Sequence, residues 1–191
     1  AIRYIHVHNG RYALIVRKGT FSEPHIAPEY QQLPLPLSRE EAITTIVTST
    51  DTKDKIVATT GMISRELFEL REHQHAGHAN DFLTVGGMGH ASQIALTIAL
   101  QHPEQRIWCL DGDGAVLMHM GGMAIIANSE ANNLVHVVLN NGAHDSVGGQ
   151  PTVGLSIDIA KIASAMGYKQ TYTVTSNTEL KKVLNQIKEA S

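Results

Sequence analysis

The 191-residue sequence predicts an α/β domain: a doubly wound parallel sheet with helices on both faces. Short apolar runs alternate with longer helix-like runs along most of the chain. That alternation is typical of a parallel sheet with right-handed crossovers. The composition, 42% hydrophobic and 17% charged, is that of a globular domain. Glycines and polar residues follow several apolar runs, and sheets of this class bind ligands at the carboxyl ends of their strands.

The N-terminal residues 1–37 are expected to form a strand and a linker outside the main domain. Residues 12–17 (YALIVR) predict a short strand. Residues 19–36 contain four prolines and show little periodicity, which predicts a linker. The main domain is expected over residues 38–191. Its first helix begins at Ser38, which forms a capping box with Glu41, and runs to about Val47.

The remaining elements alternate regularly between strand and helix. Strands are expected at residues 55–59, 81–85, 106–110, 134–139 and 170–174. Helices are expected at residues 64–71, 91–101, 115–128, 157–166 and 178–189. Ser176 and Glu179 are expected to cap the last helix.

Charge and composition exclude several classes of partner. The net charge is -3 and no run of Lys or Arg exceeds two residues, which argues against nucleic acid or an anionic membrane as the main partner. No apolar run approaches the roughly 18 residues of a membrane span, and no signal peptide is expected. The single cysteine, Cys109, excludes an intramolecular disulfide and indicates a reducing compartment, which predicts a cytoplasmic protein.

Oxygen ligands for a cation follow two strands of the expected sheet. Asp113 follows one strand, and Asn140 and Asn141 follow the next one. A single crossover separates them, so the two strands are expected to be neighbours about 4.8 Å apart. Asp113 offers a carboxylate oxygen, Asn141 an amide oxygen and Ala143 a backbone carbonyl. Mg²⁺ prefers such ligands, so a magnesium site is expected here.

The residues flanking Asp113 predict a phosphate group beside that cation. Gly112 and Gly114 allow the backbone to approach phosphates closely, and the helix expected from about Ala115 directs free N–H groups at the same place. A carboxylate alone would repel a phosphate. We therefore expect Asp113 to bind the cation, and the cation to bind a diphosphate.

These motifs resemble those of thiamine diphosphate enzymes. Gly112-Asp113-Gly114, followed after a crossover by Asn140-Asn141, resembles the signature of their diphosphate-binding domain. Four blocks are similar to one branch in particular, the phosphonopyruvate decarboxylases, which are themselves similar to sulfopyruvate decarboxylases. The blocks are TTGMISREL (59–67), HANDFLTVGGMGHASQIAL (78–96), DGDGAVLMHMG (111–121) and LNNGAHDSVGGQPT (139–152). The segment AHDSVGGQPT favours the phosphonate branch.

The resemblance implies decarboxylation of 3-phosphonopyruvate to phosphonoacetaldehyde and carbon dioxide, with thiamine diphosphate and Mg²⁺ as cofactors. It assigns Mg²⁺ to Asp113, Asn141 and the carbonyl of Ala143. Gly112, Gly114 and Ala115 would wrap the diphosphate. Gly86 would offer its carbonyl to the aminopyrimidine ring, and Met88 would wedge beneath the bent cofactor.

The resemblance also implies a partner. In this superfamily a glutamate on a separate pyrimidine-binding domain activates the cofactor, and no such domain is found in this sequence. Residues 12–20 look like the last strand of one. We therefore expect an alpha subunit or another domain to complete the site, within a homo- or hetero-oligomer that acts on a small 2-oxo acid.

Several further residues have two interpretations each. His144 and Asp145 would transfer a proton or contact the phosphonate, or would only order the cofactor. Ser146 would contribute a hydroxyl to the substrate, or would belong to a flexible turn. Arg65 would pair with a phosphonate, although a solvated arginine on a helix surface is favoured. His73, His75 and His78 suggest zinc, but a histidine-rich loop is favoured over a metal site.

Three alternative functions stay open at this point. Sulfopyruvate is an alternative substrate. A nicotinamide-dinucleotide-binding module is suggested by Gly87-x-Gly89 and Asp111, but Ser92 occupies the third glycine position and the Asp113–Asn141 pairing is then unexplained. A non-catalytic subunit is the third alternative, and the presence of Asp113 and Asn141 argues against it.

Overall fold

The computed structural model describes residues 2–22 and 35–189, and the chain divides into two units, residues 1–31 and 32–191. In the first unit, α1 (Ile2–His8) is followed by residues 11–17 without regular structure. The strand predicted for residues 12–17 is therefore wrong. A strand needs a hydrogen-bonded neighbour, and Leu14 and Ile15 are instead 75% and 88% exposed. Most of the predicted linker, residues 23–34, lies outside the described residues.

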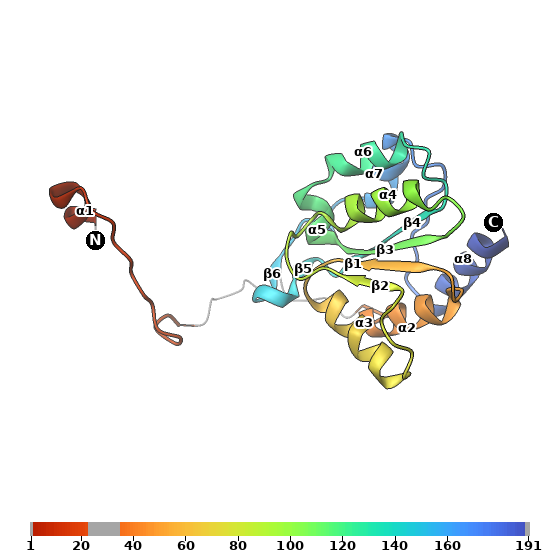
Figure 1. Cartoon of the computed structure of the whole chain (residues 1–191), viewed down its shortest axis with the longest axis horizontal. Helices are drawn as coiled ribbons and strands as arrows, with labels where there is room; N and C mark the ends of the chain where they lie inside the picture. Colours follow the sequence, from red (N-terminus) through yellow and green to blue (C-terminus); the bar gives the residue numbers. More distant parts are fainter. Residues whose placement is uncertain (1, 23–34, 190–191) are drawn as a thin grey trace. The chain divides into compact units, whose positions relative to one another are not determined.

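The second unit contains a four-stranded parallel sheet with strand order β2-β1-β3-β4 (Figure 1). The strands are β1 (Lys55–Ala58), β2 (Asp81–Leu83), β3 (Ile107–Gly112) and β4 (Leu134–Leu139). Their positions match four of the five strands predicted for this domain. The chain leaves β1 toward β2 on one side and later returns to β3 on the other. The strand order therefore reverses between β1 and β3, which is the switch point at which doubly wound sheets bind ligands.

Helices cover both faces of this sheet (Figure 1). The helices are α2 (Arg39–Ser49), α3 (Met62–His73), α4 (Ala91–Gln101), α5 (Asp113–Met118), α6 (Gly121–Ala127), α7 (Ile159–Met166) and α8 (Asn177–Glu189). Ile56 and Trp108 pack in one core cluster with residues of α2, α3 and α8. Val57 and Cys109 point to the other face and pack against α4. Because successive side chains of the central strands are buried on opposite faces, the predicted doubly wound architecture is confirmed.

Two further predicted elements, both in the second unit, differ from the structure. The helix expected over residues 115–128 is divided into α5 and α6, because Gly121 and Gly122 weaken a continuous helix and α4 approaches closely at Gly122. There the amide of Gln93 donates to the carbonyl of Gly122 at 3.1 Å. The strand expected at residues 170–174 is absent: this segment forms no ladder with a neighbour, and Val174 packs instead against the core shared by α2 and α8.

Both predicted helix caps are confirmed. Ser38 and Glu41 form the full capping box at the start of α2, and the backbone N–H of Glu179 donates to the hydroxyl of Ser176 at the start of α8. A two-stranded antiparallel hairpin that the sequence did not predict, β5 (Ala143–His144) and β6 (Gln150–Pro151), follows β4. In the described part of the chain, no helix is long and apolar enough to span a membrane.

Candidate functional site

A cleft lies at the carboxyl ends of β1 and β3, at the switch point of the sheet. It is lined by Arg39, Thr59, Thr60, Met62, Ile63, Met88, Gly112, Asp113, Gly114, Ala115, Leu139, Asn141, Ala143, His144, Asp145 and Ser146. Most of the residues proposed from the sequence are therefore brought together in one place. Arg39, Thr59 and Thr60 also line the cleft, although the sequence assigns no role to them.

The turn after β1 contributes donors to this cleft. Thr59 is 3% exposed, and its hydroxyl has no hydrogen-bond partner among the described residues. Ser64 fixes the turn by donating its hydroxyl to the carbonyl of Thr59 at 2.7 Å. Gly61, with φ +103°, starts α3 without a side-chain cap, so the first N–H groups of that helix are free of intrahelical partners. A buried hydroxyl and an uncapped helix N-terminus together suit an anion.

Asp113 is the central acidic group of the cleft. Its side chain is buried, with 2% of the residue exposed, and it forms no ion pair within the described part of the chain. The hydroxyl of Thr152 donates to its Oδ2, and Thr152 in turn accepts the backbone N–H of Gly154 at 3.0 Å. One neutral donor does not compensate a buried carboxylate, which favours an external cation at this position.

The two asparagines after β4 have different partners. Asn140 is tied to the Gly154 segment: its amide donates to the carbonyl of Gly154 at 2.7 Å and its oxygen accepts the N–H of Gly142. Asn141 lines the cleft. Its Oδ1 accepts the N–H of Ala143 at 3.1 Å, and its Nδ2 donates to Asp145 at 2.7 Å. The carboxamide oxygen of Asn141 keeps one lone pair, as a metal ligand requires.

Gly114, Met88 and His144 meet on one wall of the cleft. A Cβ on Gly114 would collide with the imidazole of His144 and lie 3.4 Å from the terminal methyl group of Met88. Glycine at this position therefore allows the imidazole and the thioether to lie directly against the backbone at the start of α5. The β5–β6 hairpin carries His144 to this position.

Arg39, the first residue of α2, reaches the same cleft from a distant part of the sequence. Its Nε and Nη2 atoms donate to both oxygens of Glu66 at 2.6–3.0 Å, and its Nη1 donates to Asp145 at 2.8 Å. The hydrogen bonds to Glu66 are the largest cause of a raised pKa of Arg39. Burial lowers this pKa and the hydrogen bond to Asp145 raises it, and the net shift is upward. The sequence contained one signal for this residue: a cation at a helix N-terminus opposes the macrodipole.

Two predicted site residues lie outside the cleft lining. Gly86 is exposed, and a Cβ there would meet nothing within 4 Å. Arg65 is exposed on α3, with its guanidinium 4.0 Å from the sulfur of Met62. Their assignments to the aminopyrimidine and to the substrate therefore stay predictions. In the histidine-rich loop, His78 stacks on Phe68 at 4.4 Å between ring centroids and pairs with Glu72.

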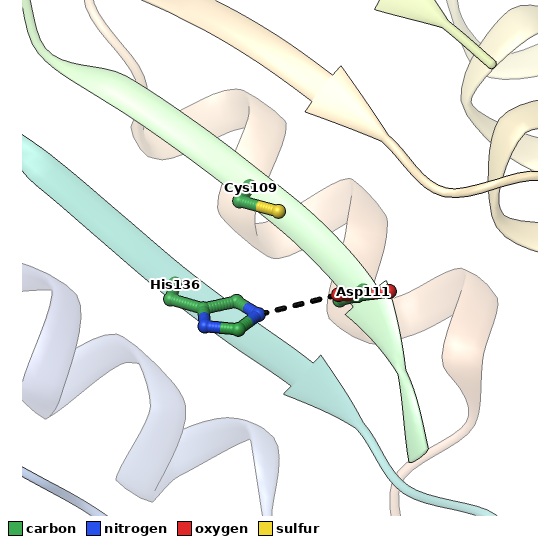
Figure 2. Close-up of side chains that lie close together, drawn as sticks. All are labelled: Cys109, Asp111 and His136. Carbon is green, nitrogen blue, oxygen red and sulfur yellow. Dashed lines mark hydrogen bonds and ion pairs between the residues drawn. The ribbon is translucent and has the colours of Figure 1, made fainter. Parts of the chain in front are cut away.

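A buried polar cluster lies on the face of the sheet that α4 covers. Figure 2 shows its three side chains on the neighbouring strands β3 and β4. Cys109, Asp111 and His136 place their polar atoms within 4.8 Å of one another. His136 lies 3.4 Å from Asp111 through Nε2 and 3.0 Å from the hydroxyl of Tyr168 through Nδ1. Burial, and then the charge of Asp111, raises the pKa of the Cys109 thiol, which disfavours the thiolate that a metal would need.

The position of Asp111 also decides against the nicotinamide alternative. A dinucleotide-binding acid must reach a ribose at the end of its strand. Asp111 instead has its side chain 1% exposed and bonds to His136 and to the backbone N–H of Gly112 at 3.0 Å. Its carboxylate therefore supports the turn that carries Gly112 and does not face the cleft.

Comparison with known protein families gives the assignment. The family model of the C-terminal, cofactor-binding domain of thiamine pyrophosphate enzymes matches residues 59–191. The chain belongs to this family. The matched residues include β2, β3 and β4 but not β1, together with all the residues around Asp113, Asn141 and the β5–β6 hairpin.

Individual relatives agree with this family. The chain is 42% identical over 130 residues to a phosphonopyruvate decarboxylase of Streptomyces viridochromogenes, a match that covers 68% of this chain and 31% of that protein. It is 36% identical over 132 residues to the sulfopyruvate decarboxylase subunit beta of Methanothermobacter thermautotrophicus, covering 69% of this chain and 68% of the subunit. The chain thus spans about a third of the phosphonopyruvate decarboxylases that it matches.

Solved structures confirm the fold. A thiamin diphosphate-dependent enzyme isolated from Mycobacterium smegmatis superposes with a TM-score of 0.64 at 23% identity, over 79% of this chain and 29% of that one. The benzoylformate decarboxylase from Polynucleobacter necessarius superposes with a TM-score of 0.62 at 18% identity, over 79% of this chain and 30% of that chain.

Proposed function

We propose that this chain supplies the diphosphate- and metal-binding half of a thiamine diphosphate-dependent decarboxylase that converts 3-phosphonopyruvate to phosphonoacetaldehyde and carbon dioxide. One observation carries the proposal. The carboxylate of Asp113 is buried at the switch point of the sheet with no cation of the described chain beside it. Because burying an unpaired charge is costly, a retained carboxylate of this kind favours a role in binding a cation.

The residues around Asp113 fit Mg²⁺ and a diphosphate. A carboxylate, the amide oxygen of Asn141 and the carbonyl of Ala143 form an all-oxygen donor set, as a hard divalent cation prefers. The unpartnered hydroxyl of Thr59 and the uncapped start of α3 lie on the same cleft and suit the phosphate oxygens. The backbone of Gly112, Gly114 and Ala115 lines the cleft beside the cation ligands.

The bound cofactor would supply the carbanion that adds to the keto carbon and accepts the electrons released with carbon dioxide. The residues of this chain would bind and orient it. Met88 would support the bent cofactor from below, since its side chain is apolar and adaptable. His144, held over Gly114 on the same wall, would carry a proton at its imidazole. Ser146 would offer a hydroxyl to the substrate from the same loop.

The phosphonate branch is favoured over the sulfonate branch by the relatives. Two phosphonopyruvate decarboxylases are 42% and 40% identical to the chain, and a sulfopyruvate decarboxylase subunit beta is 36% identical over a similar length. Both substrates are 2-oxo acids with a second acidic group, so sulfopyruvate is the alternative substrate. Arg65 is proposed to approach that group only when a partner is bound, since it is exposed in this structure.

A pyrimidine-binding domain is proposed as the partner. The chain covers 31% of the phosphonopyruvate decarboxylases but 68% of a sulfopyruvate decarboxylase subunit beta. The same domain thus occurs in relatives as part of a longer protein and as a named subunit. We propose that the active oligomer places a glutamate of the partner domain, and the aminopyrimidine contact of Gly86, against the cleft described above. A cytoplasmic location is proposed from the single cysteine, which is free and buried.

Cofactor binding tests the proposal first. Thiamine diphosphate is titrated by calorimetry into the full chain, with Mg²⁺ and with a chelator, and NADH is titrated in parallel. Saturable binding that requires Mg²⁺ is expected. Saturable NADH binding that is indifferent to Mg²⁺, with no thiamine diphosphate binding, would refute the proposed function.

Substrate choice is tested on the chain combined with its pyrimidine-binding partner. Carbon dioxide release from phosphonopyruvate, sulfopyruvate and pyruvate is compared at equal concentrations. Phosphonopyruvate is expected to give the highest kcat/KM. Equal kcat/KM values for all three acids would show that the second acidic group is not recognised.

A further inference from the structure

We infer that Arg39 and Asp145 form a positioning relay that orients the side-chain amide of Asn141 for the metal. The relay runs from Glu66 on α3, through Arg39 on α2 and Asp145 at the start of the short 3-10 helix 145–147, to Asn141. This inference rests on the proposed function, because it concerns how a proposed magnesium ligand is held.

The last contact of the relay decides which end of the Asn141 amide faces the metal. Asn141 donates its Nδ2 to Asp145 at 2.7 Å, and an ionised carboxylate can only accept. The nitrogen is therefore committed to Asp145, and Oδ1 is left on the side of the Ala143 backbone, where it accepts an N–H at 3.1 Å. A flipped amide would turn a donor toward the cation and the carbonyl oxygen toward a carboxylate.

Arg39 holds Asp145 in the position that this contact needs. It donates to Asp145 at 2.8 Å, and its side chain and that of Asp145 are 22% and 27% exposed. The other edge of its guanidinium is fixed by both oxygens of Glu66, whose side chain is only 9% exposed. A planar fork anchored on a packed helix restrains its second partner more tightly than a solvated lysine would.

The position of Arg39 supports a dedicated role. It is the first residue of α2, directly after the capping box of Ser38, where a cation opposes the helix macrodipole. The two carboxylates offset that opposition. They also make the trio net negative, so Arg39 is a poor receptor for a phosphonate dianion and is better explained as a positioning residue.

The metal affinity of relay variants tests the inference. Mn²⁺ replaces Mg²⁺ as an observable probe, and its dissociation constant is measured by electron paramagnetic resonance with excess thiamine diphosphate. Arg39→Gln and Asp145→Ala are each expected to weaken Mn²⁺ binding by about 10- to 100-fold, the usual effect of removing support from a metal ligand. The double variant is expected to bind Mn²⁺ with about the same affinity as the single variant that binds it more weakly, because both substitutions act through one chain of contacts.

Arg71→Gln is the matched control. Arg71 forms a two-bond ion pair with Asp81 at 2.8 and 2.9 Å, and its side chain is 14% exposed, but the pair lies at the opposite edge of the sheet. Its loss is expected to lower stability while leaving Mn²⁺ affinity within about twofold of the wild type. Asp145 lies in a one-turn 3-10 helix between β5 and β6, so Asp145→Ala keeps the test informative if Arg39→Gln fails to fold.

A second readout needs no metal. The side-chain amide signals of Asn141 in a ¹H–¹⁵N spectrum, identified by their loss in Asn141→Asp, are expected to shift in Arg39→Gln and not in Arg71→Gln. Unchanged Mn²⁺ affinity and unshifted amide signals in the relay variants would overturn the relay alone. A wild-type chain that binds no Mn²⁺ with thiamine diphosphate would instead overturn the proposed function.

Discussion

Buried carboxylates at the amino ends of the strands, here called the amino edge of the sheet, differ in their partners from Asp113 at the carboxyl ends, the carboxyl edge. At the amino edge, Asp81 has a fully buried side chain that is paired with Arg71 through two bonds. Asp54, 7% exposed, accepts the indole N–H of Trp108 at 2.8 Å and a backbone N–H at 3.1 Å. At the carboxyl edge, Asp113 is equally buried but accepts one hydroxyl and no cation within the described residues.

This difference distinguishes carboxylates that stabilise the fold from a carboxylate that is placed to bind a ligand. Carboxylates at the amino edge are compensated by the chain itself, so their burial contributes to the fold. Asp113 and the unpartnered hydroxyl of Thr59 are compensated only when something else binds. Proteins commonly accept such a loss of stability at binding sites. Substitutions of Asp113 and of Asp81 are therefore expected to change stability in opposite directions.

The largest effect is expected from Asp113→Asn. Without the carboxylate, Mg²⁺-dependent binding of thiamine diphosphate is expected to weaken by at least about 100-fold, since a direct ligand contributes more than the residues supporting it. The free protein is expected to become more stable by on the order of 1 kcal/mol, because an unpaired buried charge is removed. Calorimetry and urea unfolding measure the two effects. A less stable variant with wild-type cofactor affinity would contradict both halves of the prediction.

Asp81→Asn is expected to have the opposite effect on stability. It removes one partner of a buried ion pair and leaves Arg71, whose side chain is 14% exposed, without its carboxylate. We expect the free energy of unfolding to fall by about 3 kcal/mol, the lower end of the range for broken buried pairs. Urea unfolding measures this loss, and cofactor affinity serves as the control, expected to match the wild type. Stability equal to the wild type would show that the amino edge is not held by this pair.

The strands and caps could be predicted because their signals are local. The runs around Val57 and Cys109 are apolar and bounded by polar turns, and the Ser38–Glu41 capping box is a pattern of four adjacent residues. The elements predicted wrongly depend on distant contacts. Residues 12–17 and 170–174 have strand-like composition, but a strand forms only where a neighbouring strand is available, which periodicity does not reveal.

The same distinction applies to the site. Asp113 and Asn141 were placed together because they follow adjacent strands, and the structure puts both on one cleft. Arg39 is separated from Asp145 by 106 residues, and α3, β2, α4 and β3 lie between Thr59 and Asp113, so no local pattern joins these residues. Whether a hydroxyl is left without a partner depends on the packed structure alone. The metal and cofactor roles themselves stay predictions that the substitutions test.

Thr59→Val separates stability from binding at the carboxyl edge. Valine has nearly the shape of threonine but lacks the hydroxyl that has no partner in the described structure. The stability of the free protein is expected to stay the same or rise by about 1 kcal/mol, since no internal hydrogen bond is lost. Thiamine diphosphate affinity in the presence of Mg²⁺ is expected to fall about tenfold, the equivalent of one hydrogen bond to a charged group.

Thr84→Val provides the control for that substitution. Thr84, 9% exposed, donates its hydroxyl to the carbonyl of Ala58 at 2.9 Å. Its replacement is expected to cost about 1 kcal/mol of stability and to leave cofactor affinity unchanged. If the two variants lose stability equally, the hydroxyl of Thr59 has a partner within the protein and is not available to bind a phosphate.

The smallest effect concerns a buried group that needs no partner. Burial raises the pKa of the Cys109 thiol, with the charge of Asp111 as the second cause, and burial followed by Cys109 and Asp111 raises that of Tyr168. The folded protein keeps both groups protonated at alkaline pH, whereas the unfolded chain begins to release the thiol proton near pH 8.5, to within about one unit. Above that pH the unfolded state binds fewer protons, so the free energy of unfolding is expected to fall as the pH rises.

Urea unfolding near pH 7 and near pH 10 measures this fall, and Cys109→Ala is expected to reduce it. Iodoacetamide is expected to label Cys109 slowly in the folded protein and rapidly in urea, since the thiolate is the reactive form. Rapid labelling of the folded protein would show that the core around Cys109 opens readily. Cys109 could then not serve as the example of a buried group that is stable without a partner, and its contrast with the buried carboxylate of Asp113 would be weaker.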